Sequence, residues 1–179
     1  MVLTTKRLLL RRMDENDYED LCEILQDAKT MHFYEHAFED EEVREWLDRQ
    51  LQRYEKDGVG LWAVILRETG EFVGQCGLTY QEVEGEQVLE VGYLFKRRHW
   101  KNGYAAEAAK GCRDYAFERL KATGVGSIVR VGNSASQKVA MRNGMRVKKR
   151  FIKHYMGIDM PHDLYWVERS DTESSAKGY

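Results

Sequence analysis

The sequence has little of what marks a secreted or membrane protein. It contains three cysteines, an odd number without a Cys-x-x-Cys pair, at Cys22, Cys76 and Cys112. Each lies within an apolar periodic segment, so buried free thiols in a reducing compartment explain them better than disulfides do. No apolar run approaches the ~20 residues that span a bilayer, and the N-terminus lacks the apolar core of a signal peptide. We therefore expect a cytoplasmic protein that has no membrane partner.

The chain also lacks an excess of charge of either sign. Its 28 basic and 30 acidic residues give a formal net charge of -2, and neither half is dominated by one sign. We therefore expect no nucleic-acid partner. With 179 residues the chain can bury one substantial core, so we predict a single domain over residues 1–169 and leave a homodimer open. The polar segment 170–179 is predicted to be disordered.

Neither a metal site nor a covalent nucleophile is predicted. His32 and His36 have the i, i+4 spacing of a zinc pair, but no third ligand lies at a suitable offset. Cys76 and Cys112 lie in segments that we expect to be buried. No residue that would activate either thiol can be identified, so a Cys-His hydrolase is not expected.

The hydrophobic periodicity changes along the chain and predicts both strands and helices. Period-two, β-branched segments predict strands, and apolar residues that recur every three or four positions predict helices. The expected strands cover residues 6–13, 60–67, 72–82, 87–95, 127–131, 146–155 and 163–169. The expected helices cover residues 18–25, 40–56, 104–120 and 134–143. The order is β-α-α-β-β-β-α-β-α-β-β, and turns at 68–70 and 84–86 make the three middle strands antiparallel.

A basic loop over Arg98–Gly103 separates the strand that ends at Phe95 from the alanine-rich helix that begins at Tyr104. Such a loop gathers main-chain N–H groups, the positive end of a helix dipole and cationic side chains, and it therefore suits a polyphosphate ligand. The Gly-x-Gly-x-x-Gly motif of dinucleotide folds and the Gly-x4-Gly-Lys-Ser/Thr motif of P-loops are both absent. The alternative to phosphate binding is a solvated basic turn at the start of a surface helix.

The loop sequence Arg98-x-x-Lys101-x-Gly103-Tyr104-Ala105 resembles the pyrophosphate loop of the GCN5-related N-acetyltransferases. The preceding segment, 92–95, is similar to the strand before that loop in the ribosomal-protein N-terminal acetyltransferase branch. The resemblance extends over residues 5–168, and the chain shares the family's order of elements. It implies an α/β fold with a mixed, mostly antiparallel central sheet flanked by helices, and acetyl-CoA as the co-substrate.

The loop departs from the family pattern at one point. Lys101 stands where the family has its first loop glycine, and Asn102 stands at the usual basic position. A lysine can adopt the geometry of a helix N-terminus without a positive φ, so we expect the loop to form. The resemblance implies that the cofactor contacts Arg98, Lys101, Asn102, Gly103, Tyr104, Ala105 and Arg142, with Arg97 and Lys138 also available for its phosphates.

Acetyl transfer to an amine needs a neutral amine, a polarised carbonyl and a stabilised thiolate. The resemblance implies Glu90 as the base, because the strand before the pyrophosphate loop passes between donor and acceptor in the family. The alternative is an exposed strand carboxylate that faces solvent beside Glu84 and Glu86. The main-chain N–H groups of Leu94 and Phe95 are expected to polarise the carbonyl where this strand splays or bulges.

A second segment, 131–145, resembles the family element in which a strand ends and a helix runs beside the pantetheine arm. Asn133 matches the position that hydrogen-bonds this arm, and Ser136 matches a candidate proton donor to the leaving thiolate. Many family members place a tyrosine where this chain has Ala140, so Ser136 or water would have to serve. The alternative role of Asn133 and Ser134 is helix capping.

The sequence therefore predicts an acetyl-CoA-dependent N-acetyltransferase that transfers the acetyl group directly to a primary amine in a ternary complex. We expect the acceptor pocket to be walled by residues 29–39, Trp62, Tyr80 and residues 155–162. A protein N-terminus would suit an open groove, and a small amine would suit an enclosed acidic pocket. Two rival classes are a non-catalytic acyl-CoA-binding module of the same fold and a scaffold whose basic loop binds a partner protein.

Overall fold

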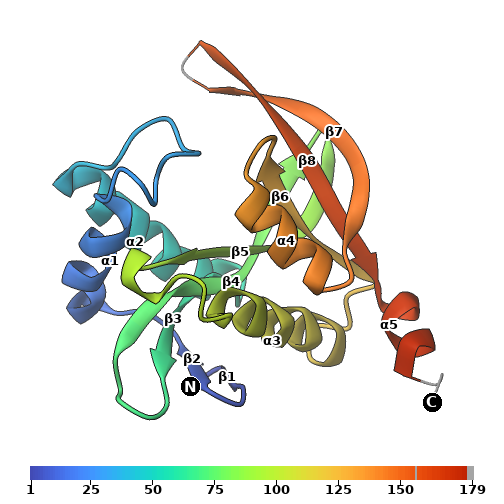
Figure 1. Cartoon of the computed structure of the whole chain (residues 1–179), viewed down its shortest axis with the longest axis horizontal. Helices are drawn as coiled ribbons and strands as arrows, with labels where there is room; N and C mark the ends of the chain where they lie inside the picture. The colour runs from blue at the N-terminus through green and yellow to red at the C-terminus, as the bar shows by residue number, and fades with distance from the viewer. Residues whose placement is uncertain (156, 177–179) are drawn as a thin grey trace.

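The computed structural model describes residues 1–155 and 157–176. Within them, eight strands form one sheet in the order β1-β2-β3-β4-β5-β6-β8-β7, with helices on both faces (Figure 1). The strands are β1 (Leu3–Thr4), β2 (Leu8–Arg11), β3 (Leu61–Leu66), β4 (Phe72–Val83), β5 (Glu86–Phe95), β6 (Gly124–Arg130), β7 (Arg146–Tyr155) and β8 (Ile158–Glu168). The α-helices are α1 (Tyr18–Leu25), α2 (Asp40–Lys56), α3 (Tyr104–Glu118), α4 (Ser134–Arg142) and α5 (Arg169–Ala176). Two 3-10 turns are η1 (Glu15–Asp17) and η2 (Arg97–His99). No helix in this described part of the chain is long and apolar enough to cross a membrane.

Among the strands that the structure describes, only β5 and β6 run parallel to each other, and the other neighbouring strands are antiparallel. The predicted fold class, a mixed and mostly antiparallel sheet flanked by helices, is therefore confirmed. The hairpin turn between β4 and β5 follows its local sequence, because Glu84 and Gly85 both have positive φ, 51° and 83°. Such turns match the right-handed twist of paired strands.

Helices α1 and α2 pack on one face of the sheet, and α3 packs on the other (Figure 1). On the first face, Leu21 and Leu47 are buried in the same cluster as Ala63 of β3. On the second face, the small residues Ala108 and Cys112 of α3 are buried with residues of β4 and β5. Small side chains let α3 approach the sheet closely, which brings its N-terminus next to the end of β5.

The sheet opens between β5 and β6. Strands β4 and β5 remain paired from Val83↔Glu86 to Gly74↔Phe95, whereas β5 and β6 share a single pair, Glu90↔Gly126. The last part of β5 therefore has a partner on one side only. The predicted splay of this strand is present, and it creates the space in which the candidate site lies.

The β7–β8 hairpin is longer than predicted. Its pairing continues to Tyr155↔Ile158, whereas the sequence predicted that the last strand begins at residue 163. Pro161 lies within β8 and accepts a hydrogen bond from the N–H of Val131 at 2.9 Å, just beyond the end of β6. Proline is tolerated at this position because its missing N–H falls where the β6 ladder has already ended.

Residues 169–176 form helix α5, where we expected a disordered segment. Hydrogen bonds stabilise its first turn, because the Thr172 hydroxyl donates to the Arg169 carbonyl at 2.7 Å and the N–H of Glu168 donates to Asp171 at 3.3 Å. The rest of the predicted disordered segment, 177–179, lies outside the described residues. The domain boundary at residue 169 stays a prediction.

Candidate active site

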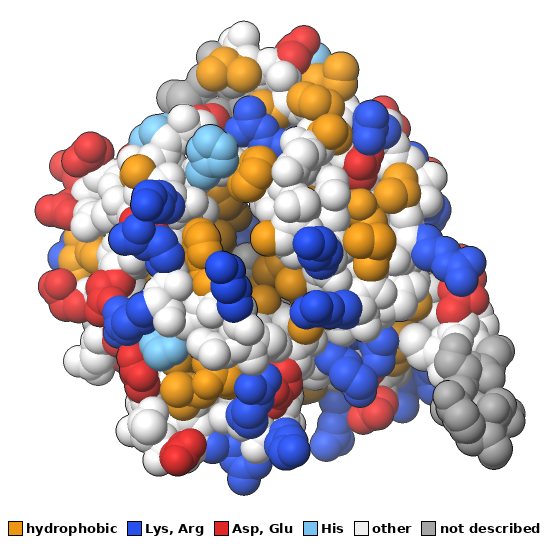
Figure 2. Space-filling model, in the orientation of Figure 1, with side chains coloured by type: hydrophobic (Ala, Val, Ile, Leu, Met, Phe, Trp, Pro, Cys, Tyr) orange, Lys and Arg blue, Asp and Glu red, His pale blue; other side chains and the backbone are white. Residues whose placement is uncertain are grey.

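A cleft of about 1550 Å³ opens where β5 and β6 part. Its walls come from α2, residues 28–38, the end of β5, the loop before α3, the start of α4 and the β7–β8 hairpin. Figure 2 shows the hollow near the middle of this face, with hydrophobic side chains inside it and Lys and Arg side chains around its rim. Pockets for single drug-sized ligands measure roughly 300–1,000 Å³, so this cleft is large enough for two substrates.

The loop between β5 and α3 forms one end of the cleft. Lys101 and Gly103 both have left-handed backbone conformations, with φ of 67° and 80°. Our expectation that Lys101 needs no positive φ is therefore wrong, and this lysine carries a conformational cost of about 1 kcal/mol that glycine would avoid. Backbone of this kind can turn several N–H groups toward one point and form an anion-binding concavity.

Arg7 fastens this loop to the rest of the domain, a role that the sequence did not predict. Its Nη1 donates to the carbonyl oxygen of Asn102 at 3.0 Å, and its Nε donates to Glu107 at 2.6 Å. Its guanidinium also lies 4.6 Å from the centroid of the Tyr104 ring. Arg7 is far from the loop in sequence, so no local pattern could have indicated these contacts.

Three basic side chains at the end of the cleft formed by this loop remain available to a ligand. Lys101, Lys138 and Arg142 line the cleft, and none of them forms an ion pair within the described residues. Asn102, Gly103, Tyr104 and Ala105 line the same end. The structure thus brings together most of the residues that the family resemblance indicated for the cofactor.

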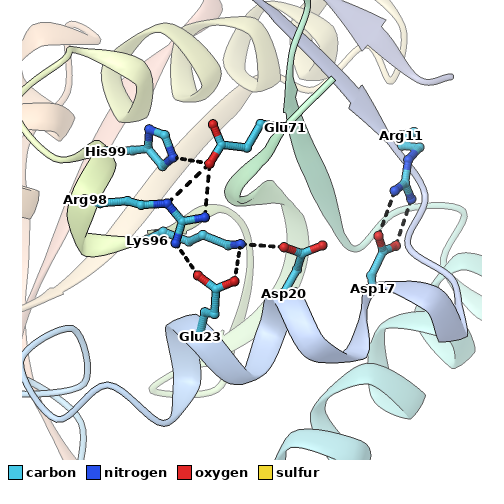
Figure 3. A network of polar contacts seen from close by, with 8 residues as sticks. All are labelled: Arg11, Asp17, Asp20, Glu23, Glu71, Lys96, Arg98 and His99. Carbon is cyan, nitrogen blue, oxygen red and sulfur yellow. Dashed lines mark hydrogen bonds and ion pairs between the residues drawn. The ribbon is translucent and has the colours of Figure 1, made fainter. Parts of the chain in front are cut away.

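Arg98 is the exception, because it does not line this cleft. Its guanidinium forms ion pairs with Glu23 and with Glu71, the latter at 3.0 Å (Figure 3). Arg98 and Arg97 border a separate, smaller cavity, where Arg97 Nε lies 3.4 Å from Asp27. The prediction of Arg98 as a phosphate contact is not supported, because two carboxylates on other elements already neutralise its charge.

Lys96 anchors the base of the loop from inside the protein. Its side chain is only 2 % exposed and forms ion pairs with Asp20 and with Glu23, the latter at 3.0 Å. His99 extends the network, since its Nε2 lies 2.9 Å from Glu71 (Figure 3). Carboxylates of α1 thus hold the end of β5 and the following loop in one orientation. The sequence reasoning missed Lys96, because a lysine after an apolar strand normally faces solvent.

Glu90 lies in the cleft at the last position where β5 and β6 pair. Its Oε1 accepts a hydrogen bond from the N–H of Ile128 at 3.2 Å, and the hydroxyl of Thr79 lies 3.5 Å from its Oε2. Burial raises the pKa of Glu90, while the charges of Lys153 and Arg53 and the Ile128 N–H act in the opposite direction. A carboxylate whose pKa is raised toward the working pH is a more effective base. The alternative of a solvent-facing strand carboxylate is not what the structure shows.

The main chain of β5 offers hydrogen-bond donors to the gap. The N–H of Lys96 donates to Val73 of β4 at 3.0 Å, so the alternation of an antiparallel ladder turns the backbone of Leu94 toward β4. The N–H groups of Tyr93 and Phe95 face the other way, into the gap beside β6. The role of the Phe95 N–H as a donor therefore stays a prediction that fits this geometry, whereas the Leu94 N–H faces β4 and only the residue's side chain is left for the cleft wall.

Asn133 and Ser136 lie at the start of α4 and line the cleft. The Asn133 Oδ1 accepts from the N–H of Ser136 at 3.1 Å, so Asn133 caps this helix. Capping leaves the amide nitrogen of Asn133 for a ligand. The hydroxyl of Tyr93 donates to the carbonyl oxygen of Ser136 at 2.9 Å and fastens α4 to β5 across the gap. Ala140, which stands at the place of the family's tyrosine, is 1 % exposed and does not line the cleft.

The opposite end of the cleft is the predicted acceptor pocket, and only some of the residues predicted for its walls line it. Most of residues 28–38 line it, but Trp62 and Tyr80 do not. Trp62 is 1 % exposed and packs on the other face of the sheet, where its ring centroid lies 5.5 Å from that of Tyr115 of α3. Their strand neighbours line the cleft instead, because adjacent side chains point to opposite faces; these neighbours are Leu61, Thr79 and Gln81.

The β7–β8 hairpin completes this end of the cleft. Lys153, His154, Met160 and His162 line it. The Nδ1 of His162 lies 2.9 Å from the Met160 carbonyl oxygen. Burial lowers the pKa of His162, and the charges of Lys153 and Arg130 lower it further.

The histidines and cysteines considered above have other partners. The Nε2 of His36 lies 2.8 Å from a carboxylate oxygen of Glu42, and no group of three metal-ligating side chains is found in the part of the chain that the structure describes. The Sγ atoms of Cys76 and Cys112 lie 3.6 Å apart between β4 and α3, and both residues are buried. Burial raises the pKa of Cys112 well above its usual value, which opposes thiolate chemistry.

A cationic loop before a helix, a half-buried carboxylate and a strand edge that faces a cleft are features that suit acyl transfer from CoA. The family model described as an acetyltransferase (GNAT) domain matches residues 7–146, and the chain therefore belongs to the GNAT family. It is an acetyl-CoA-dependent acetyltransferase, as the loop sequence had indicated.

Individual relatives agree with this assignment. The Bacillus subtilis (strain 168) protein YkkB is 41% identical over 153 residues, which cover 84% of this chain and 88% of YkkB. A GNAT-family acetyltransferase from Bacillus anthracis has the same fold, with a TM-score of 0.81 at 24% identity over 95% of this chain and 99% of that one. RimL, a ribosomal L7/L12 α-N-protein acetyltransferase solved with CoA, has a TM-score of 0.76 at 16% identity over 93% and 97% of the two chains. These similarities confirm the resemblance to the ribosomal-protein acetyltransferase branch at the level of the fold.

Proposed function

We propose that the chain transfers an acetyl group directly from acetyl-CoA to a primary amine in a ternary complex, with Glu90 as the base. The observation that carries this proposal is the place of Glu90, a half-buried carboxylate with a raised pKa at the point where β5 and β6 part. A group at that point can reach both a thioester that lies between the strands and an amine that enters from the other end of the cleft.

The phosphates of CoA are assigned to the loop end of the cleft. Lys101, Lys138 and Arg142 supply positive charge there, and the N-terminus of α3 adds unpaired N–H groups and the positive end of its dipole. Asn102, Gly103, Tyr104 and Ala105 supply the backbone and walls. The amide nitrogen of Asn133 is the donor proposed for the pantetheine arm.

The proposed reaction conserves atoms and charge. The amine nitrogen attacks the carbonyl carbon of the thioester, the C–N bond forms, and the C–S bond breaks. Glu90 takes the proton that the amine loses and passes it to solvent, and the thiolate takes a proton from water or from Ser136, which then regains one from solvent. The N–H of Phe95 stabilises the negative charge that develops on the carbonyl oxygen.

One experiment separates this proposal from its rivals. Purified protein is incubated with acetyl-CoA and a panel of amines, while free thiol and product mass are followed together. The proposal expects CoA release in equal amount to an acetylated amine. A non-catalytic acyl-CoA-binding module would show a CoA-dependent rise in melting temperature without product, and a protein-binding scaffold would show neither.

A further inference from the structure

The acceptor end of the cleft carries basic side chains that form no ion pair within the described residues. On α2, Trp46, Arg49 and Arg53 recur at three- and four-residue spacing, so they share the face of the helix that lines the cleft. Arg53 is half-buried, and its Nη1 donates to the side-chain oxygen of Gln50 at 3.3 Å. Neither arginine forms an ion pair with any residue that the structure describes.

A third cation reaches the same region from the other wall. Lys153 of β7 is half-buried, lines the cleft and has no carboxylate partner within the described residues. Arg130, at the end of β6, also lines the cleft, where its Nη1 donates to the carbonyl oxygen of Phe33 at 3.0 Å. Basic side chains from three elements therefore converge on this end.

These charges act on the proposed base. Lys153 and Arg53 both lower the pKa of Glu90 against the effect of its burial. Burial lowers the pKa of Arg53, and the charge of Arg49 lowers it further, while the charges of Glu90 and Asp57 act in the opposite direction. Partial burial removes some of the water around Arg53 and Lys153. An anion bound beside these two cations would compensate for this lost hydration.

Four glutamates also line this end of the cleft, and their places relative to the cations matter for the choice of acceptor. Glu35 and Glu45 line this end of the cleft, and Glu42 is occupied by His36 at 2.8 Å. Glu90 itself is needed to receive a proton from the amine. A polycationic acceptor that placed its second charge near Arg53 and Lys153 would be repelled there.

We propose that the acceptor is a small amine that carries a carboxylate a few bonds from its nitrogen, as an amino acid does. The amine faces Glu90, and the carboxylate is held by Arg53 and Lys153. Arginine suits this role because its planar guanidinium can donate two parallel hydrogen bonds to one carboxylate. This inference rests on the proposed acetyl transfer and narrows its substrate class.

The test compares acceptors that differ only in the carboxylate. Acetylation is measured with the common amino acids, with the carboxamides of the same amino acids, with linear polyamines and with a short peptide that has a free N-terminus. We expect at least one amino acid to have a kcat/KM about 10-fold or more above that of its carboxamide, since a charged hydrogen-bonded contact is lost in the amide.

Variants then assign the preference to its residues. Arg53→Gln and Lys153→Gln should each lower kcat/KM for the amino acid, mainly through KM, by about 10-fold more than for its carboxamide, because any effect on the pKa of Glu90 is common to both acceptors. Arg53→Lys should keep part of the preference. Arg44→Gln is the matched control, because Arg44 lies on the same helix, outside the cleft, with its guanidinium 4.3 Å from the Tyr18 ring.

The outcomes separate this inference from the function on which it rests. Equal or better use of carboxamides, polyamines or the peptide, with acetylation otherwise intact, overturns the carboxylate assignment alone. An amino-acid preference that survives in both glutamine variants overturns the assignment to Arg53 and Lys153. No transfer to any acceptor, beside a normal CoA-induced rise in melting temperature, overturns the proposed function and the inference together.

Discussion

The carboxylate of Glu90 on β5 accepts a hydrogen bond from the main-chain N–H of Ile128 on β6, at 3.2 Å. In a continuous sheet this N–H would donate to a backbone carbonyl of β5. Here the strands have already parted beyond Glu90↔Gly126, and a side chain replaces the missing ladder bond. The divergence of the strands therefore holds the proposed base in place.

Glu90→Gln should lower kcat by about 10²-fold or more and leave the KM for acetyl-CoA nearly unchanged, because the amide keeps the shape but cannot take a proton. The loss should be largest below the pKa of the amine, where a proton must still be removed. It should shrink as pH rises and the amine deprotonates unaided. Steady-state kinetics across a pH series check this. A loss that does not vary with pH would recast Glu90 as a group that positions the acceptor.

The same substitution should not lower stability at neutral pH. Burial raises the pKa of Glu90, so the folded state holds its proton more tightly than the unfolded state does. The ionised form therefore destabilises the fold above the raised pKa, and the penalty vanishes below the unfolded pKa of about 4.3, where both states are protonated. We expect the melting temperature of Glu90→Gln to equal or exceed that of the wild type at pH 7–8. The advantage should disappear near pH 4, and a clear loss of stability at pH 7 would contradict this account.

Lys101 combines a charge for the cofactor with a strained backbone, and two substitutions separate these effects. Lys101→Gly should stabilise the fold by about 1 kcal/mol, because glycine adopts positive φ freely, and should raise the KM for acetyl-CoA, because the charge is lost. Lys121, whose φ is 57°, is exposed and does not line the cleft. Lys121→Gly should therefore give a similar gain in stability without a change in KM.

Salt supplies the second readout for the same residue. Lys101→Glu should weaken acetyl-CoA binding, and the difference from wild type should become smaller at high ionic strength, where the charges are screened. If Lys101→Glu leaves the KM for acetyl-CoA untouched, Lys138 and Arg142 become the leading phosphate contacts.

The ion pairs of Lys96 and Arg98 should stabilise the fold and hold the loop after β5 in its orientation. Hydrogen bonds from Arg98 and Lys96 outweigh the effect of partial burial and lower the pKa of Glu23. A lowered carboxyl pKa stabilises the fold above the unfolded pKa, and this stability is lost as pH falls through the folded value. Lys96→Met should therefore lower the free energy of unfolding by about 2 kcal/mol at pH 7. This is less than for a fully buried ion pair, because Asp20 and Glu23 are partly exposed. The loss should be smaller under acid conditions. Denaturant unfolding at two pH values checks this. An unchanged unfolding midpoint at pH 7 would show that these ion pairs do not stabilise the fold.

Local sequence patterns predicted the elements whose causes are local. Helix α2 begins and ends at the predicted residues, 40 and 56, because a capping box joins Glu39 to Glu42 and Gly58 takes a positive φ of 73° beyond its end. The loop over Arg98–Gly103 was likewise found by its composition. In each case the signal and the structure it specifies lie within a few residues.

Features that depend on distant contacts could not be predicted in this way. The all-apolar segment 61–66 is buried on both faces, so its pattern does not show that Trp62 points away from the cleft. Arg98 was assigned to phosphate from its position in the loop, but Glu23 and Glu71 come from elements far away in sequence. The convergence of Arg53 and Lys153 depends on the packing of α2 and β7 around the same cleft, and no local pattern encodes it.

The central claim is that the cleft transfers an acetyl group from acetyl-CoA to an amine through Glu90. The most direct measurement follows thiol release and product mass for the wild type and for Glu90→Gln, with acetyl-CoA and the amine panel, beside a CoA-dependent thermal shift. The account predicts a CoA shift in both proteins, with equal amounts of CoA and acetylated amine formed rapidly by the wild type and at a rate at least about 10²-fold lower by the variant. A CoA shift in both proteins without product from the wild type, or equal rates in the two, would contradict it.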